Sequence, residues 1–423
     1  MKQTKEILLI LLVSFSLNVS GQLQNTAFNK IYHLVEQKNF FKASEIYEAQ
    51  KNELTTVHRQ IIEVILDNAF NRLEISNKNI TRLTRSKNNL PDSLMLKLYK
   101  TKEDNAVKLF DYRAAKNAVT TILADYKKLL SDNDRNEIEN NLKIWTVLER
   151  EPKQQVKIKE FNRLKMEKDK AGLNNLKVSG DKNTVDFIFD TGANLSTTSE
   201  TAARQLNMKI IPADIKVGTI TGETVFAQLA VCPIMTLGNI EIRNAVFLVL
   251  KDDVLAFPQI DYKINGILGF PVIEALKEIQ TTPDGYFIVP KKETKYEAKS
   301  NMAMDGLTPL ILLNDKHFAL DTGADHTILY SSYYSENRQE IESNRTQTTI
   351  AFGGAAGAKE FKGYKIDISF NVNDKNVTLK NVSVLTHSLE EKENGIYGNI
   401  GQDFIRRFDK MTLNFNRMFI KFN

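Results

Sequence analysis

The chain is 423 residues long, which is enough for two or three domains with substantial cores. It carries 57 lysines and arginines against 52 aspartates and glutamates, and the resulting net charge of +5 is dispersed, so no nucleic-acid partner is indicated. The single cysteine, Cys232, excludes an internal disulfide and a cysteine-based zinc site, and its apolar neighbours predict a buried thiol.

Residues 1–21 have the pattern of a secretory signal peptide. Lys2 and Lys5 precede an apolar run, and the small residues Ser20 and Gly21 follow it. The run is short for a membrane-spanning helix, so we expect cleavage after Gly21, with a retained membrane anchor as the alternative. An exported protein without disulfides suits a bacterial periplasm or the exterior of a bacterial cell. We therefore expect a periplasmic or secreted protein with no stable membrane span after cleavage.

Residues 22–165 have the composition and periodicity of a helical domain. Glycine is almost absent, and apolar residues recur at spacings of three and four. The segment at Phe41 is similar to the later segment at Tyr112, because both have an aromatic residue, a spacer and an alanine. The distance between them is about twice the 34-residue period of tetratricopeptide repeats, which the domain resembles. A generic helical bundle and a removable pro-segment are the alternatives, and a protein partner docking on the helices is expected.

Residues 166–175 are polar and carry turn signals, and we expect them to form a linker. Beyond them, glycine, threonine and β-branched residues become more frequent, and the apolar runs shorten to the length of strands. This part of the chain is duplicated. We assign the first lobe to residues 176–295 and the second lobe to residues 296–423.

Each lobe contains an apolar strand that runs directly into the sequence Asp-Thr-Gly-Ala, with Asp190 in the first copy and Asp321 in the second. A further glycine follows each aspartate at almost the same distance along the chain. It is Gly269 in the first lobe and Gly401 in the second. One such motif is a common turn, but two with matching downstream glycines indicate that each copy contributes one carboxylate.

Each lobe also has a segment that predicts a hairpin with glycines at its tip. These glycines are Gly218 and Gly222 in the first lobe, and Gly353 and Gly354 in the second. Short strands in this repeated order predict an all-β, barrel-like fold.

The duplicated part resembles the aspartic proteases of the retropepsin-like kind, with Asp-Thr-Gly-Ala in both lobes of one chain. The resemblance covers about residues 176 to 422. It implies a multidomain α plus all-β protein, in which a helical, tetratricopeptide-like domain precedes a two-lobed retropepsin-like acid-protease β-barrel. It also implies that Asp190 and Asp321 are the catalytic pair.

The resemblance implies supporting roles for the neighbours of the two aspartates. Thr191 and Thr322 would hold the two loops together by hydrogen bonds. Gly192 and Gly323 would let the backbone pass close to the catalytic pair. The glycine-tipped hairpins would be flaps over the cleft.

Two carboxylates about 3 Å apart cannot both ionise, so they share a proton and their pKa values separate. The ionised member can take a proton from a water that attacks a peptide carbonyl, while the protonated member donates to the carbonyl oxygen. We therefore expect a monomeric aspartic endopeptidase that acts on peptides or proteins without a metal or cofactor. A catalytically silent or zymogen-locked peptide-binding protein is the alternative.

Several residues depart from the family pattern. Asn399 replaces an apolar residue in the segment before Gly401, which weakens the match there. Ala193 and Ala324 stand where pepsins often carry serine or threonine. Without those hydroxyls the carboxylates lose hydrogen bonds, so we expect a working pH less acidic than that of pepsin.

Asp325 and the histidines are not expected to take part in catalysis. Asp325 follows the second motif, and we expect a loop or substrate-contact role for it rather than direct catalysis, whereas Asn194 occupies the equivalent position in the first lobe. The five histidines are scattered and form no His-Glu-x-x-His motif, so metal catalysis is not indicated.

Overall fold

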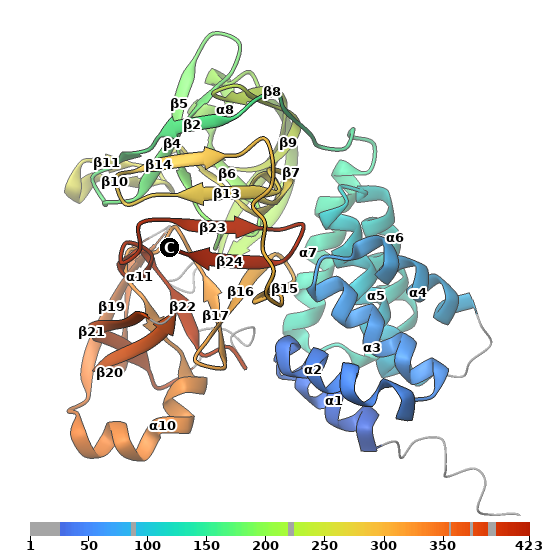
Figure 1. Ribbon diagram of the computed structural model, residues 1–423. Helices are drawn as coiled ribbons and strands as arrows, with labels where there is room; N and C mark the ends of the chain where they lie inside the picture. Colours follow the sequence, from blue (N-terminus) through green and yellow to red (C-terminus); the bar gives the residue numbers. More distant parts are fainter. Residues whose placement is uncertain (1–25, 86–89, 219–223, 355–356, 373–374, 388–394) are drawn as a thin grey trace, which may run out of the picture.

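The computed structural model describes residues 26–85, 90–218, 224–354, 357–372, 375–387 and 395–423. A helical region lies beside a larger β-rich part, as Figure 1 shows. This arrangement confirms the expected combination of helices followed by strands. The predicted signal peptide lies outside the described residues. In the part of the chain that is described, no helix combines the length and the apolar character that a membrane crossing requires.

Within the described residues, seven α-helices form the helical region, and consecutive helices pack against one another. Short 3-10 turns at Lys51–Glu53 and Lys127–Leu129 follow the second and the sixth helix. The helices are α1 (Thr26–Glu36), α2 (Phe40–Gln50), α3 (Thr56–Ala69), α4 (Leu73–Arg85), α5 (Asp92–Lys108), α6 (Tyr112–Asp125) and α7 (Asp132–Leu148).

Three of the helical hairpins share one turn geometry. After α1, α3 and α5 a residue adopts a positive φ: Lys38 at 58°, Asn71 at 57° and Phe110 at 54°. In each turn the next backbone N–H donates to the carbonyl five residues earlier, which satisfies the end of the preceding helix. The hairpin of α3 and α4 thus shares its turn geometry with the hairpins on either side of it. The tetratricopeptide-like identity stays a prediction.

The change from helix to strand comes earlier in the chain than expected. The last helix of the helical region, α7, ends at Leu148. The stretch from there to residue 165, which we expected to belong to the helical domain, contains β1 (Gln155–Ile158) and β2 (Asn162–Lys165). The expected linker holds β3 (Glu167–Lys168) and the start of β4. Sequence reasoning missed these strands because they are short and highly charged, and because their pairing partners lie far along the chain.

The first lobe is built on a nine-stranded sheet with the order β1-β9-β6-β12-β5-β4-β8-β7, and β3 pairs with β4. Two short helices, α8 (Glu200–Gln205) and α9 (Phe270–Ala275), and the small β10–β11 pair (Ala256–Phe257, Tyr262–Lys263) with the 3-10 turn Pro258–Ile260 complete it. The remaining strands are β4 (Asn174–Ser179), β5 (Thr184–Phe189), β6 (Ser196–Ser199), β7 (Lys209–Gly218), β8 (Thr224–Leu237), β9 (Ile240–Leu250) and β12 (Gly266–Leu268).

The second lobe has an eight-stranded sheet with the order β15-β16-β17-β22-β18-β21-β20-β19. Its helices are α10 (Ser331–Asn344) and α11 (Gln402–Ile405). Its strands are β15 (Met302–Asp305), β16 (Thr308–Leu313), β17 (Lys316–Leu320), β18 (Ile328–Leu329), β19 (Thr348–Gly354), β20 (Gly357–Val372), β21 (Lys375–Leu385) and β22 (Gly398–Ile400).

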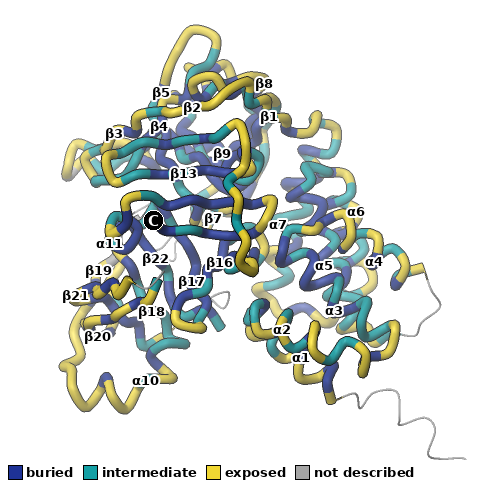
Figure 2. Tube along the Cα trace, viewed as in Figure 1, coloured by how far each residue is buried: buried dark blue, intermediate teal, exposed yellow. Residues whose placement is uncertain are grey.

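A third sheet joins the two lobes. It has the order β2-β14-β13-β23-β24, and the antiparallel pairing of β13 with β23 connects the end of the first lobe to the end of the chain. Its other strands are β13 (Glu278–Thr281), β14 (Tyr286–Val289), β23 (Met411–Asn414) and β24 (Phe419–Phe422). Figure 2 shows buried residues along the strands of all three sheets, whereas most of α10 is exposed. The joined lobes thus form one scaffold that sets the distance between the two motifs.

Candidate active site

The two Asp-Thr-Gly loops begin at equivalent points of the two lobes. In the first lobe, β5 runs parallel to β12, and the N–H of Asp190 donates to Leu268 O at 3.2 Å. In the second lobe, β17 runs parallel to β22, and the N–H of Asp321 donates to Ile400 O at 3.0 Å. The apolar strand residues before each aspartate are buried, so each loop leaves its sheet from a fixed position.

The two threonines of the motifs bind the loops to each other. Thr191 Oγ1 donates to Leu320 O at 2.7 Å, and Thr322 Oγ1 donates to Phe189 O at 3.0 Å. Each hydroxyl also accepts the backbone N–H of the other threonine, both at 3.0 Å. All four hydrogen bonds cross between the lobes, and both threonines are buried. The structure thus brings Thr191 and Thr322 together, as the resemblance implied.

The motif glycines let each loop approach the aspartate of the other lobe. A Cβ atom on Gly192 would lie 2.6 Å from Asp321 Cγ, and a Cβ atom on Gly323 would lie 2.4 Å from Asp190 Cγ. Real Cβ atoms do not come this close, so only glycine fits at either position. The N–H of Gly192 donates to Asp190 Oδ1, and that of Gly323 donates to Asp321 Oδ1, each at 2.8 Å.

Asp190 and Asp321 share one partly exposed site at the meeting point of the loops. Burial, the charge of Asp321 and a hydrogen bond with Asp321 together raise the pKa of Asp190 well above its ordinary value of 3.8. The backbone N–H groups of Gly192 and Ala193 act in the opposite direction, but they do not outweigh burial. A carboxyl group that keeps its proton beside a second carboxyl is the arrangement that acid–base catalysis by a pair requires.

Asn399 contacts the pair, and sequence reasoning missed it as a site residue. Its Nδ2 donates to Asp321 Oδ2 at 2.8 Å. The sequence does carry a signal for it, because Asn399 is a polar residue at a position that is apolar in the family pattern. Ile267 occupies the corresponding position in the first lobe, since Ile267 pairs with Ile188 as Asn399 pairs with Ala319.

The downstream glycines cross behind the loops in both lobes. Gly269 N–H donates to the buried Ser196 Oγ at 3.0 Å, and Gly401 N–H donates to the buried Thr327 Oγ1 at 3.1 Å. A Cβ atom on either glycine would lie 2.7 Å from the backbone that follows the motif in its own lobe. The matching spacing of these glycines in the sequence therefore reflects a close backbone crossing.

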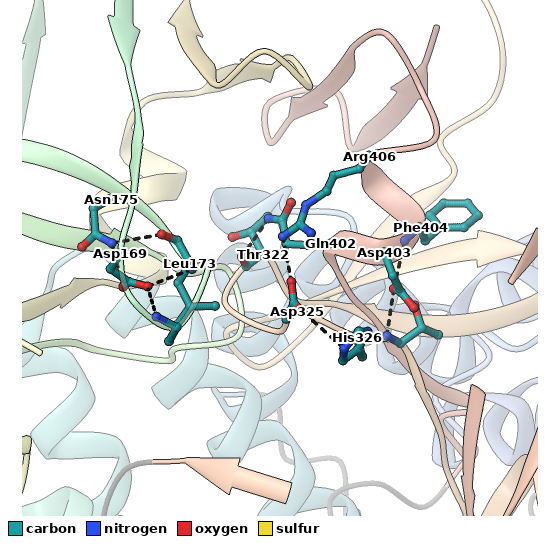
Figure 3. A network of polar contacts seen from close by, with 12 residues as sticks. Asp169, Leu173, Asn175, Thr322, Asp325, His326, Gln402, Asp403, Phe404 and Arg406 are labelled. Carbon is teal, nitrogen blue, oxygen red and sulfur yellow. Dashed lines mark hydrogen bonds and ion pairs between the residues drawn. The ribbon is translucent and has the colours of Figure 1, made fainter. Parts of the chain in front are cut away.

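Asp325 lies in an ion pair next to the second loop rather than on the catalytic pair. Arg406 Nη2 contacts Asp325 Oδ1 at 2.8 Å, and His326 Nε2 lies 3.2 Å from Oδ2. Figure 3 shows this cluster beside Gln402, whose Nε2 donates to Thr322 O at 2.8 Å. Asn194, the counterpart in the first lobe, instead contacts Thr308 Oγ1 at 3.4 Å.

The two glycine-tipped segments are hairpins. In the first lobe β7 pairs with β8 up to Gly218, and Gly222 lies outside the described residues. In the second lobe β19 pairs with β20, with Gly353 opposite Ala358 and Gly354 opposite Gly357. The role of these hairpins as flaps stays a prediction.

The lone cysteine is confirmed as a buried thiol. Burial raises the pKa of Cys232 to about 11, which makes it unreactive at neutral pH. Over the described residues, no three side chains of His, Cys, Asp or Glu are grouped so as to hold a metal ion.

Comparison with known families gives one match. Residues 175–272 match the family described as "Aspartyl protease". The matched stretch contains Asp190 and Gly269, whereas the second lobe and the helical region lie outside it. The match supports a protease-type, hydrolytic function that acts on peptide substrates. Comparison with curated proteins finds no similar sequence.

Proposed function

We propose that this protein is an aspartic endopeptidase in which Asp190 and Asp321 activate a water molecule against a peptide bond. The observation that carries the proposal is the crossed network of Thr191 and Thr322, which holds one carboxyl group from each lobe at a common site. The raised pKa of Asp190 supports it, because one of the two carboxyl groups must be protonated when the other is ionised.

The reaction proceeds by general acid–base catalysis without a covalent intermediate. The ionised carboxylate takes a proton from water as the water oxygen bonds to the carbonyl carbon. The protonated carboxyl group donates its proton to the carbonyl oxygen, which gives a tetrahedral diol. When the C–N bond breaks, the leaving nitrogen takes a proton from the pair, and the pair recovers one from the diol.

The wider assignments belong to the same proposal. The basic and apolar pattern of residues 1–21 supports export from a bacterial cytoplasm. The repeated helical hairpins support a tetratricopeptide-like region that docks a protein partner. Because both aspartates come from one chain, we propose a monomeric enzyme.

The test is cleavage of a diverse peptide mixture between pH 3 and pH 8. Wild type is compared with Asp190→Asn and Asp321→Asn, with and without a statine-type transition-state analogue. We expect both substitutions to reduce cleavage by at least a thousandfold, because the pair acts as a unit, and the analogue to block the wild type. Folded wild-type protein that binds the analogue but cleaves nothing at any pH would contradict the proposal and favour a peptide-binding protein.

A further inference from the structure

The two halves of the site are duplicated, yet they differ in one side chain that contacts the aspartates. At the position two residues before the downstream glycine, the first lobe has Ile267 and the second has Asn399. Both residues lie in the short strand that runs parallel to the strand of the motif, at the same register. The difference is therefore in chemistry and not in backbone position.

The contacts of the carboxyl groups show what this difference does. The backbone of each loop serves its own aspartate. Gly192 N–H and Gly323 N–H each donate at 2.8 Å to one carboxyl oxygen, and Ala193 N–H also donates to Asp190. Asp321 also receives a side-chain donor, since the Nδ2 of Asn399 donates to its other oxygen, Oδ2, at 2.8 Å. Ile267 is apolar and has no side-chain group that could donate to Asp190. Thus only the second lobe applies a side-chain dipole from this position to its carboxylate.

We propose that Asn399 is a positioning residue that holds the negative charge of the pair on Asp321 and leaves the shared proton on Asp190. An N–H donor bonds more strongly to an ionised carboxylate than to a neutral carboxyl group, so it favours the charged form of its partner. This inference rests on the proposed function, because it assigns roles within the same pair. It makes Asp321 the base that takes a proton from water and Asp190 the acid that donates to the carbonyl oxygen.

Asn399 also supplies a donor that the motif itself lacks. Ala324 and Ala193 carry no hydroxyl with which to support the carboxylates. The amide of Asn399, which comes from β22, replaces such a donor for Asp321 alone. The two carboxyl groups therefore differ in their side-chain donors, although the strands and loops that carry them are duplicated.

The other charged groups of this region are engaged elsewhere. Asp325 is paired with Arg406 and lies beside His326. Asp403 accepts hydrogen bonds from Thr327 N and Oγ1 at 2.9 and 2.7 Å. None of these contacts includes Asn399, so a substitution at residue 399 changes the pair without removing a neighbouring ion pair.

The first experiment is the pH profile of kcat/KM for wild type, Asn399→Ile and Asn399→Ala. Asn399→Ile copies the first lobe, and Asn399→Ala removes the amide without adding volume. Loss of a donor to a charged group should move the acid limb of the profile upward by about one pH unit. The double variant Ile267→Asn/Asn399→Ile returns one donor to the pair and should move the limb back towards the wild-type position. Thermal melts identify any variant that is not folded.

The second experiment does not depend on turnover. Aspartate is labelled with carbon-13 at the carboxyl carbon, and the signals of the pair are assigned from Asp190→Asn and Asp321→Asn. At a pH where the pair holds one proton, we expect the wild-type charge on Asp321, and in folded Asn399→Ile a charge shared between both aspartates.

The outcomes separate the two proposals. A wild type without cleavage overturns the proposed function, while the carboxyl signals still decide the role of Asn399. A folded Asn399→Ile with an unchanged acid limb and unchanged carboxyl signals overturns the inference, even if cleavage is normal.

Discussion

Thr191 and Thr322 each use a single hydroxyl twice, once as acceptor and once as donor, and all of these bonds cross between the lobes. Both side chains are buried, so water cannot replace a lost partner. The position of the two carboxyl groups therefore depends on two hydroxyl groups as much as on the aspartates themselves.

A threonine-to-valine substitution tests this contribution at the residue scale. Thr191→Val keeps the shape but leaves Leu320 O and Thr322 N–H without their partner, which should lower the free energy of unfolding by about 2–4 kcal/mol. Thr191→Ser keeps the hydroxyl and should cost less than about 1.5 kcal/mol. Urea unfolding of both variants gives the comparison. Equal losses for valine and serine would show that packing of the methyl group matters, and not the hydrogen bonds.

At the scale of elements, the edge of the first sheet is covered by a helix. β7 ends the strand order of this sheet, and an uncovered edge strand invites pairing with other chains. From α7, Asn140 meets the backbone of Lys216 in β7 with both ends of its amide: Nδ2 donates to Lys216 O at 3.0 Å, and Oδ1 accepts Lys216 N–H at 2.9 Å. Lys143 Nζ adds a contact to Asp214 O at 3.2 Å. The helical region thus hydrogen-bonds to the open edge of β7, the strand that leads into the first predicted flap.

We expect Asn140→Ala to loosen this edge. The substitution removes two hydrogen bonds to the backbone of Lys216, which should lower the free energy of local opening by about 1.4 kcal/mol. The backbone amide of Lys216 should therefore exchange with solvent about tenfold faster. Hydrogen exchange followed by mass spectrometry measures the effect. The control is Asn136→Ala, an exposed position on the same helix. Comparable acceleration in the control, or none in Asn140→Ala, would contradict the role of this contact.

At the scale of the whole molecule, the helical region and the lobes are not separate bodies joined by a tether. Their buried side chains belong to shared clusters, one of which holds Trp145 and Leu148 of α7 together with Leu229 of β8. Polar contacts also cross the boundary. Asn71 Nδ2 donates to Glu274 Oε1 at 2.7 Å and to Phe415 O at 3.1 Å. A fragment that starts after residue 165 would lose β1 and β2 as well as the helices, so truncation there removes parts of two sheets.

Glu274 makes this contact between the regions dependent on pH. Burial raises its pKa from 4.5 to about 7, although the Lys108 ammonium and the Asn71 amide favour the charged form and Asp104 opposes it. The folded chain therefore binds more protons than the unfolded chain between about pH 4.5 and pH 7. Stability from this group is present at low pH and is lost as the pH rises through that window.

We expect Glu274→Gln to remove this loss while its amide oxygen still accepts from Asn71. As the pH rises from 5 to 8, the free energy of unfolding of the wild type should fall relative to that of Glu274→Gln. The relative fall should be on the order of 3 kcal/mol or less. Urea unfolding followed by the fluorescence of Trp145, the single tryptophan, measures it. Glu297→Gln, at an exposed position, is the control. A pH dependence that is the same in wild type and Glu274→Gln would show that Glu274 does not titrate in this range.

Local pattern carried much of the candidate site. An apolar strand followed by Asp-Thr-Gly, present twice, carried the resemblance that implied which residues meet. Such a motif can be recognised because its strand and its tight turn are encoded within a few positions. The division into a helical region and a β-rich part followed in the same way from periodicity and glycine content. The early strands β1 and β2 could not be predicted, since a short charged strand is stable only through its partners, which lie far along the chain in β9 and β14.

By itself the sequence determined the pair of aspartates, their threonine and glycine neighbours and the two-lobed duplication, because each motif is a run of adjacent residues and the same run occurs twice. Only the tertiary structure decided that Asn399 of β22 donates to Asp321, which follows β17, and that Asn140 of α7 bonds to Lys216 of β7. Both contacts arise where separate elements are brought side by side by the burial of their apolar faces. The identity of a residue shows that it can donate a hydrogen bond, and only the packing of distant elements decides which group receives it.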